Sequence, residues 1–261
     1  MKQIWSMMVA AGLLSFVGTA IGEEGESGSG GFHDGWDALL KAHVSKGLVD
    51  YEAIKNAPAA LDDYLEKLSE AAPAGMSRDH QLAFWINAYN AFTVKLIVDN
   101  MPLKSIRDID APWKQKRWRV GDTLYNLDAI EHEILRKVFR EPRIHFAIVC
   151  ASIGCPDLQP WAYCGESAGS QLDRATRLFM ASPKHIQTEV SSGLLGRKRY
   201  ILRVSKIFKW FGDDFTDGGK RSVVDLIRLY ASDETVSFLS EANASPTIKT
   251  LGYDWLLNAQ N

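Results

Sequence analysis

The chain has 261 residues, of which 46% are hydrophobic, 24% charged and 10% aromatic, and this composition excludes a disordered, collagen-like or coiled-coil polypeptide. The 30 Lys and Arg residues nearly balance the 32 Asp and Glu residues, and the formal net charge is -2. No global field favours nucleic acid or anionic lipid, so we expect a globular protein that does not bind nucleic acid.

The N-terminal segment has the features of an export signal. Lys2 supplies a positive charge, the apolar run Ile4–Ile21 follows it, and small residues stand at the end of the run. We therefore predict a signal peptide at residues 1–22. The alternative is an uncleaved membrane anchor, because an apolar run of about 18 residues is at the lower margin for spanning a bilayer.

The predicted signal is followed by a linker and a single folded domain. Residues 23–31 (EEGESGSGG) are acidic and rich in Gly and Ser, which is typical of a flexible linker. The domain is expected at residues 32–261. A cleaved signal implies a periplasmic or secreted protein without stable membrane insertion.

Apolar residues at helical spacing predict helices in the first part of the domain, at Gly35–Lys46, Ala59–Glu70 and Ser77–Asn100. The third has the longest apolar stripe, and Pro102 follows its end. Residues 118–125 are predicted to form a β-hairpin around a Gly-Asp turn.

The second half of the domain alternates between predicted helices and strands. Asp128 is predicted to cap a helix that runs to about Arg140. The apolar run 143–150 (RIHFAIVC) is typical of a buried strand and leads into a loop at 151–160. Further along we expect a helix at 165–180, a second hairpin from 186–190 and 199–204, and helices at 206–211, 221–230 and 234–240. These elements predict an α+β fold in which a small, mainly antiparallel sheet packs against several helices around one core.

Five separated strings resemble domain-of-unknown-function family 547 (DUF547), in the order that this family shows. They are FWINAYNAFTVKLI (84–97), YNLDAIEHEILR (125–136), PRIHFAIVCASIGCP (142–156), IFKWFGDDF (207–215) and YDWLLN (253–258). The resemblance spans about residues 35–258. It implies a domain found in exported bacterial proteins, with a fold related to papain-like or transglutaminase-like thiol enzymes.

Three cysteines, Cys150, Cys155 and Cys164, are close together in the sequence. In an oxidising compartment at most two of them can pair, so one thiol is left over. Cys150 stands where the predicted buried strand becomes a loop, which would hold its side chain rigidly at a cleft. The resemblance also implies that Cys150 belongs to the core motif of the family. We therefore take Cys150 as the candidate nucleophile; the alternative is a small buried hydrophobic residue.

Two histidines are candidates for the base that would accept the thiol proton. His132 is near the start of a predicted helix, where the helix dipole favours the neutral imidazole, and the neighbouring Glu131 offers a carboxylate to the site. On a regular strand, His145 and Cys150 would point to opposite faces. His132 is therefore the first choice and His145 the second. The alternative for His132 is a surface or capping role.

Asn87 and Asn90 are three residues apart on one face of an apolar helix, although Asn is a poor helix former. One interpretation is structural, with both amides tying the helix to a neighbouring segment. The other places them at the substrate, where they or the backbone amides of 151–154 would stabilise an oxyanion. Cys155 is a further candidate for contacting the substrate.

Two functions remain open from the sequence. The first is a thiol hydrolase or transferase that acts on a peptide, an amide or a glutathione-like substrate, although His132 precedes Cys150 whereas thiol enzymes of this type have Cys first. The second is a non-catalytic module that binds a peptide or small molecule in the same cleft. A disulfide between Cys150 and Cys155 would make any activity depend on reduction.

We expect neither a cofactor nor a metal. The histidines and cysteines offer zinc ligands by residue type, but no Cys-x-x-Cys or His-Glu-x-x-His spacing is present. The basic aromatic stretch 113–119 is expected to be a solvated edge strand. Trp210, Phe211, Asp213 and Asp214 are expected to rim a cleft; the alternative for the two adjacent carboxylates is a solvated position on a turn.

Overall fold

The computed structural model describes residues 31–192, 197–243 and 245–260. The predicted signal peptide and residues 23–30 of the predicted linker lie outside the described residues. None of the helices in the described residues is both long and apolar enough to span a bilayer.

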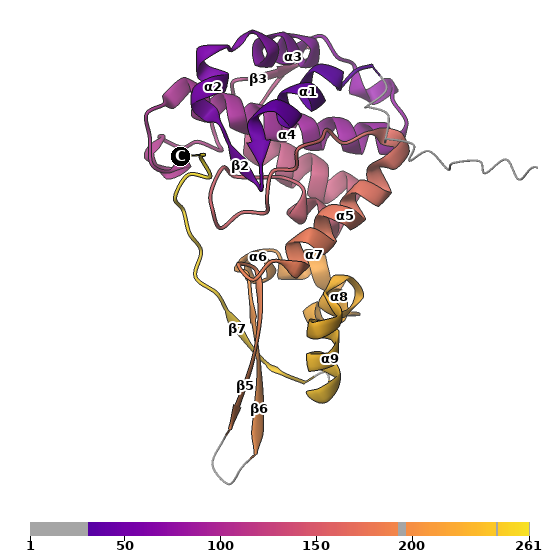
Figure 1. Cartoon of the computed structure of the whole chain (residues 1–261). Coiled ribbons are helices and arrows are strands. Elements are labelled where there is room, and N and C mark those ends of the chain that lie inside the picture. The colour runs from indigo at the N-terminus through magenta and orange to yellow at the C-terminus, as the bar shows by residue number, and fades with distance from the viewer. Residues whose placement is uncertain (1–30, 193–196, 244, 261) are drawn as a thin grey trace, which may run out of the picture.

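The first half of the chain forms a helical body, drawn in indigo to magenta in Figure 1. Its elements are α1 (Asp34–His43), β1 (Val44–Ser45), β2 (Leu48–Val49), α2 (Tyr51–Asn56), α3 (Ala59–Ser69), the 3-10 helix η1 (Pro73–Gly75), α4 (Arg78–Asn100), the 3-10 helix η2 (Ile106–Asp108), β3 (Trp118–Val120), β4 (Thr123–Tyr125), the π-helix η3 (Ala129–Phe139) and the 3-10 helix η4 (Pro142–Phe146).

Helix α4 is the central element of this body. Ser77 caps its first turn, with its side-chain hydroxyl accepting a hydrogen bond from the His80 amide. Most of its residues are buried all round, because α2, α3, η3 and α5 (Ala168–Ala181) pack against it. A helix surrounded by other elements can carry apolar residues on every face, and α4 therefore anchors the larger hydrophobic core.

The second half of the chain forms an extension below the body in Figure 1. It contains the 3-10 helix η5 (Gly165–Ser167), α5, β5 (Ile186–Ser192), β6 (Lys198–Val204), α6 (Ile207–Trp210), α7 (Gly212–Thr216), α8 (Val223–Tyr230), α9 (Asp233–Glu241) and β7 (Thr247–Thr250). A separate cluster of buried side chains, including Phe146, Phe179 and Leu202, fills it. The expectation of one core is therefore wrong, because side chains of these short elements, together with Phe146 of η4, form a second buried cluster beside the larger one.

The strands form three small sheets instead of one. β1 with β2 and β3 with β4 are antiparallel hairpins, and β5 pairs antiparallel with β6. Strand β7, which the sequence pattern missed, pairs parallel with β6. Helices and small, mainly antiparallel sheets confirm the α+β class.

The segment 143–150 is not a strand, contrary to the sequence-based expectation. Its first part belongs to η4, and the remainder runs without a regular partner to Cys150. The apolar run is buried because α4 holds it. The Asn90 side chain accepts from the Val149 amide at 3.0 Å and donates to the Ala147 carbonyl at 3.0 Å. An apolar run this short does not distinguish a strand from other buried structure.

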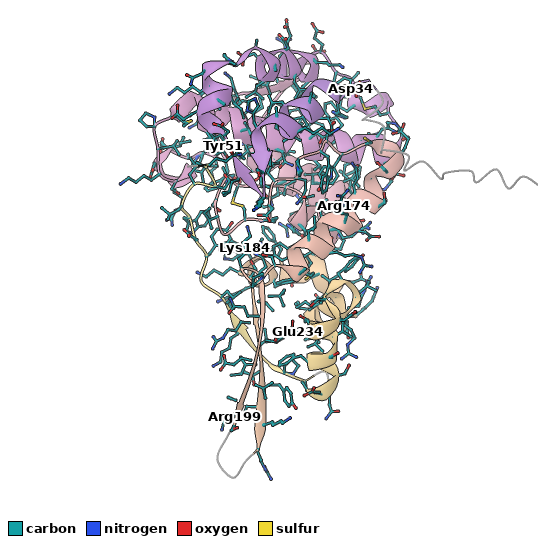
Figure 2. The ribbon with its side chains drawn as sticks, in the orientation of Figure 1. Asp34, Tyr51, Arg174, Lys184, Arg199 and Glu234 are labelled. Carbon is teal, nitrogen blue, oxygen red and sulfur yellow. A yellow bond between two sulfur atoms is a disulfide. The ribbon has the colours of Figure 1, made fainter. Side chains whose placement is uncertain are left out.

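After β7 the chain leaves the extension and returns to the body, ending beside β2 and α2 in Figure 1. This return is fixed by backbone hydrogen bonds from the amides of Ile153 and Gly154 to the carbonyls of Leu256 and Asp254, each 2.8 Å. The C-terminal segment (residues 251–260) thereby lies against the loop that carries the cysteines, and Figure 2 shows its side chains between the body and the extension.

Candidate active site

A cavity of about 360 Å³ opens where η3, η4, the loop that carries Cys150 and Cys155 (the cysteine loop), α6 and the C-terminal segment meet. Its volume is in the range of small-molecule sites. Six aromatic residues line it: Tyr89, Trp113, Trp210, Phe211, Tyr253 and Trp255. The expected role of Trp210 and Phe211 at the rim of a cleft is confirmed.

The candidate catalytic residues Cys150, Glu131, His132 and His145 line this same cavity, as does Cys155, the candidate for contacting the substrate. Cys150 and His145 therefore face one space, contrary to the expectation that they point to opposite faces. The alternation of a strand does not apply, because His145 belongs to the 3-10 helix η4.

Cys150 and Cys155 form a disulfide, and Cys164 is the free cysteine of the described residues. Cys155 is buried at 3% exposure, whereas Cys150 is partly exposed. Cys150 is therefore the sulfur that a ligand in the cavity can reach. Cys164 lies apart from this cavity, and burial raises the pKa of its thiol.

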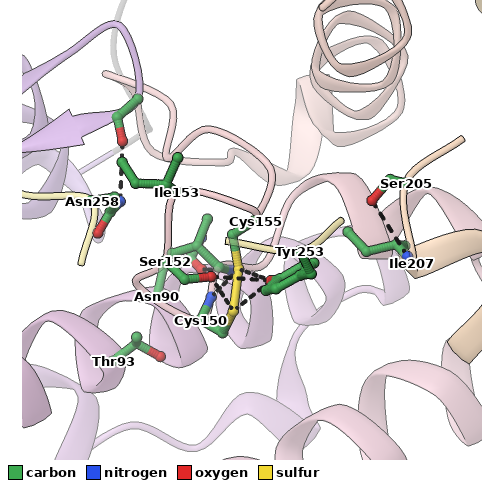
Figure 3. Close-up of a disulfide and its surroundings, with 12 residues drawn as sticks. Asn90, Thr93, Cys150, Ser152, Ile153, Cys155, Ser205, Ile207, Tyr253 and Asn258 are labelled. Atoms are coloured by element: carbon green, nitrogen blue, oxygen red, sulfur yellow. Dashed lines mark hydrogen bonds between the residues drawn. A yellow bond between two sulfur atoms is a disulfide. The ribbon is translucent and has the colours of Figure 1, made fainter. Parts of the chain in front are cut away.

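Tyr253 covers the disulfide with its hydroxyl group. Figure 3 shows the phenol aimed at both sulfurs, at 3.0 Å from Cys150 Sγ and 3.1 Å from Cys155 Sγ, with Ser152 Oγ donating to it at 3.1 Å. Burial raises the pKa of Tyr253 to about 12, although the Ser152 bond opposes this shift. The phenol therefore keeps its proton and remains a hydrogen-bond donor at neutral pH.

The surroundings of His132 differ from the sequence-based expectation. Arg136 donates to its Nδ1 at 3.1 Å. Because a guanidinium can only donate, Nδ1 must accept, and a neutral His132 in this arrangement carries its proton on Nε2. Glu131 does not orient His132, because the Glu131 carboxylate instead accepts a hydrogen bond from the Tyr89 hydroxyl at 3.1 Å.

His145 is part of a charged network that the sequence pattern missed. Its Nε2 lies 2.7 Å from Asp214 Oδ2, and Arg136 holds the same carboxylate through two hydrogen bonds of 2.6 Å and 2.9 Å. Burial alone would raise the pKa of Asp214, but the bonds to His145 and Arg136 outweigh it and hold the pKa well below its usual range. The ionised carboxylate makes Nε2 the donor and leaves Nδ1 of a neutral imidazole able to accept a proton.

The alternative of a solvated Asp213–Asp214 pair on a turn is thus wrong for Asp214. The two residues belong to helix α7, which turns Asp214 toward Arg136 and His145. Phe211 stacks on the His145 ring with centroids 4.0 Å apart and fixes its orientation. Spacing along the chain gave no signal for this pairing, because 69 residues separate His145 from Asp214.

Asn87 and Asn90 are absent from the cavity wall. The Asn87 side chain accepts from the Tyr163 amide at 2.9 Å and donates to the Tyr163 carbonyl at 2.8 Å, and Asn90 holds residues 147 and 149 in the same way. Both side-chain amides are occupied by backbone groups, as expected if they tie α4 to neighbouring segments. The amides of Ile153 and Gly154 are also occupied, by the C-terminal segment.

No group of three His, Cys, Asp or Glu side chains in the described residues is arranged to hold a metal ion. The basic stretch 113–119 is divided, since Trp113 lines the cavity and Trp118–Val120 form strand β3.

The comparisons with known proteins identify the central part of the chain. The family model described as "Protein of unknown function, DUF547" matches residues 73–180. The comparison with curated proteins and the comparison with solved structures each gave no match. The matched segment holds the cysteines and both cavity histidines, whereas Trp210, Tyr253 and Trp255 lie outside it. The resemblance indicated by the sequence motifs is confirmed for residues 73–180, which match the DUF547 family model.

Proposed function

We propose that this domain is a cysteine-dependent hydrolase or transferase whose nucleophile, Cys150, becomes active when its disulfide to Cys155 is reduced. The observation that carries the proposal is that Cys150 and two histidines line one cavity, with the partly buried carboxylate of Asp214 hydrogen-bonded to His145. A thiol, a base and a group that orients the base are the parts that nucleophilic catalysis requires.

His145 is the better base of the two histidines. The Nδ1 lone pair of His132 accepts a hydrogen bond from Arg136, whereas Asp214 binds the proton on Nε2 of His145 and leaves Nδ1 to accept another. The ionised Asp214 also stabilises the imidazolium that forms when His145 takes a proton. This reverses the order of preference drawn from the sequence.

The chemistry proceeds in three balanced steps. An external dithiol first reduces the disulfide, giving two thiols. His145 then accepts the Cys150 proton while the sulfur bonds to the substrate carbonyl carbon, and the carbon–nitrogen bond breaks as the amine leaves with that proton. Water, or another nucleophile in a transferase, finally attacks the thioester and restores the thiol.

The substrate class proposed is a peptide, an amide or a glutathione-like molecule. We extend the proposal to a fold related to papain-like or transglutaminase-like thiol enzymes, which the family resemblance implies. His145 precedes Cys150 here, the reverse of the order in those enzymes. The proposal also includes export to the periplasm or exterior, supported by the apolar run near the N-terminus, and no role with nucleic acid, supported by the balanced charge.

A non-catalytic binding module is the second candidate. The observation that favours it is the disulfide itself, since both sulfurs are bonded to each other and covered by Tyr253. In that case the cavity binds its ligand with the sulfurs as part of the wall.

Alkylation by iodoacetamide after mild reduction distinguishes the two functions. We expect Cys150 to be labelled with a midpoint well below about pH 8.5, the reference value for a free thiol. Cys164 is the internal control, since it is a partly exposed thiol outside the cavity. Mass spectrometry locates each modified residue.

The midpoint of Cys150 should rise in His145→Ala and change less in His132→Ala. A Cys150 that reacts no faster than Cys164 across the pH range would contradict the thiol-enzyme proposal and favour the binding module. If labelling is selective, a screen of peptide and amide substrates follows, with Cys150→Ser as the inactive reference.

A further inference from the structure

The wall of the cavity has a composition that points to the charge of its ligand. Trp113, Trp210, Tyr253 and Trp255 form a continuous aromatic cluster, with ring centroids 4.6 to 6.2 Å apart between neighbours. Aromatic faces attract organic cations through the negative potential above the ring. An aromatic wall alone is equally suited to a neutral apolar ligand, so the charged groups decide.

Those charged groups are acidic. Asp128 and Glu131 line the cavity, and none of the described residues that line it is Lys or Arg. Glu131 is only 9% exposed, and although the charge of Arg136 acts on it, no cation of the described residues forms an ion pair with it. The Tyr89 hydroxyl supplies one hydrogen bond. Burying a carboxylate without a cationic partner costs free energy. A positively charged hydrogen-bond donor in the cavity would therefore be stabilised at Glu131.

We infer that the cavity binds a protonated organic amine, with its ammonium group at Glu131 and its apolar body against the tryptophan and tyrosine rings. If the domain is the proposed enzyme, this inference names its substrate class, and to that extent it rests on the proposed function. Binding itself requires the cavity and not the thiol.

The protein's own cations occupy other parts of the aromatic wall. Arg107 lies over Trp255 at 5.2 Å and Arg136 over Phe211 at 5.1 Å. In the described part of the chain no such cation covers Trp113, Trp210 or Tyr253. Trp210 is 46% exposed, so it is the ring that solvent and ligand reach first.

Three probes of nearly equal shape and different charge test the inference: 2-phenylethylamine, 2-phenylethanol and 3-phenylpropionate. Each probe is titrated at pH 7 into the full-length protein with its disulfide intact. The change in tryptophan fluorescence is the readout. A neighbouring hollow of about 580 Å³ is lined by Arg136, Lys137, Arg140 and Arg221 and contains no tryptophan, so an anion bound there leaves this signal nearly unchanged. We expect the amine to bind about tenfold more tightly than the alcohol, and the acid more weakly than both.

Two glutamates on η3 supply the matched variants. Glu131→Gln keeps the shape and the acceptor for Tyr89 but removes the charge, and it should abolish the preference for the amine over the alcohol. Glu133→Gln removes an exposed carboxylate that pairs with Lys137 outside the cavity, and it should leave the preference unchanged. Trp210→Leu should weaken the amine and the alcohol alike.

Several results would overturn the inference: equal affinities for amine and alcohol, tightest binding of the acid, no binding at millimolar concentration, or equal effects of the two glutamine variants. If Glu131→Gln does not fold, the probe series on the unmodified protein decides alone. Because these titrations use oxidised protein, amine binding without selective Cys150 labelling contradicts only the thiol enzyme. Selective labelling without amine binding contradicts only the ligand class.

Discussion

Tyr253 joins the two kinds of chemistry found in the cavity. Its ring belongs to the aromatic cluster, while its hydroxyl contacts both sulfurs of the disulfide. After reduction the same hydroxyl can donate to a Cys150 thiolate, because burial keeps the phenol protonated. A hydrogen bond to a charged group is worth about 1.5–3 kcal/mol.

We predict that Tyr253→Phe raises the alkylation midpoint of Cys150 in the reduced protein by about one to two pH units, since one unit corresponds to about 1.4 kcal/mol. Tyr230→Phe is the control, because that phenol donates to Asp173 away from the cavity. An unchanged midpoint in Tyr253→Phe would show that the hydroxyl does not stabilise the thiolate.

Two buried histidines predict sensitivity to acid. Burial lowers the pKa of His33 to about 4 and that of His185 to about 3, with smaller contributions from Lys67 and Lys184 respectively. Between the unfolded value near pH 6.5 and these folded values, the unfolded chain binds protons that the folded chain does not. The free energy of unfolding is therefore fully present above about pH 6.5 and falls as the pH is lowered toward 4.

His185→Phe isolates one of these contributions. The His185 ring stacks on Phe179 at 3.8 Å, and its Nε2 is buried without a hydrogen-bond partner, so a phenylalanine ring fits the site. We expect the variant to lose about 3 kcal/mol less than the unmodified protein between pH 7 and pH 4. Urea unfolding at a series of pH values measures this, and His43→Gln, at a partly exposed position, should behave like the unmodified protein. Parallel pH profiles of His185→Phe and the unmodified protein would refute the assignment.

At the residue scale, the sequence predicted the residues of the cavity better than their roles. Cys150, Cys155, His132 and His145 were found because rare polar residues interrupted apolar runs. Asp214 could not be assigned to His145, nor Tyr253 to Cys150, because 69 and 103 residues separate these partners and only the folded chain brings them together.

The cysteine loop and the C-terminal segment act as one unit at the scale of elements. Gly154 is where they approach most closely, since a Cβ on this residue would lie 2.9 Å from the backbone nitrogen and oxygen of Asp254. Backbone atoms cannot move aside as a flexible side chain can. A side chain at position 154 therefore separates the loop from the segment that carries Tyr253 and Trp255.

We predict that Gly154→Ala lowers the free energy of unfolding by about 1–3 kcal/mol and weakens amine binding, because the aromatic wall shifts. Gly169→Ala is the matched control: it lies in helix α5 with no atom within 4 Å of the added Cβ, so it should be neutral or slightly stabilising. Denaturant unfolding and the fluorescence titration measure both effects. Wild-type stability in Gly154→Ala would show that the two segments tolerate separation.

Helices with an apolar pattern at helical spacing were predicted closely, as with α3 and α4. The hairpins β3–β4 and β5–β6 were also predicted from turn residues between alternating strands. Helix α7 and strand β7 were missed because each is short, and all four residues of β7 are exposed, so it has no apolar pattern. The segment 143–150 was assigned wrongly because burial by α4 gives the same apolar run as a strand.

At the scale of the whole molecule, the two cores are joined by the returning C-terminal segment. Asn258 fixes its end in the body: it accepts from the Tyr51 hydroxyl at 2.7 Å and donates to the Gly47 carbonyl at 3.1 Å. Asn258 is 3% exposed, so both partners lose their hydrogen bonds if its side chain is removed.

Asn258→Ala should lower the free energy of unfolding by about 2–4 kcal/mol and release the C-terminal segment before the helices unfold. The part of the tryptophan fluorescence that comes from Trp113, Trp210 and Trp255 in the cavity should then change at lower denaturant concentration than circular dichroism. Gln260→Ala removes two exposed hydrogen bonds nearby and should cost less than about 1 kcal/mol. Coincident transitions in Asn258→Ala would show that the segment and the body unfold together.

Tyr253, which covers the disulfide, comes long after the cysteines in the sequence, and this has a consequence for biosynthesis. Tyr253 follows Cys150 by 103 residues, and at about 5–20 residues per second a ribosome takes roughly 5–20 s to add them. During that interval the nascent chain has both thiols and neither Tyr253 nor Trp255. Any oxidant that meets the growing chain in this interval finds an uncovered pair, so the disulfide can form before Tyr253 is in place.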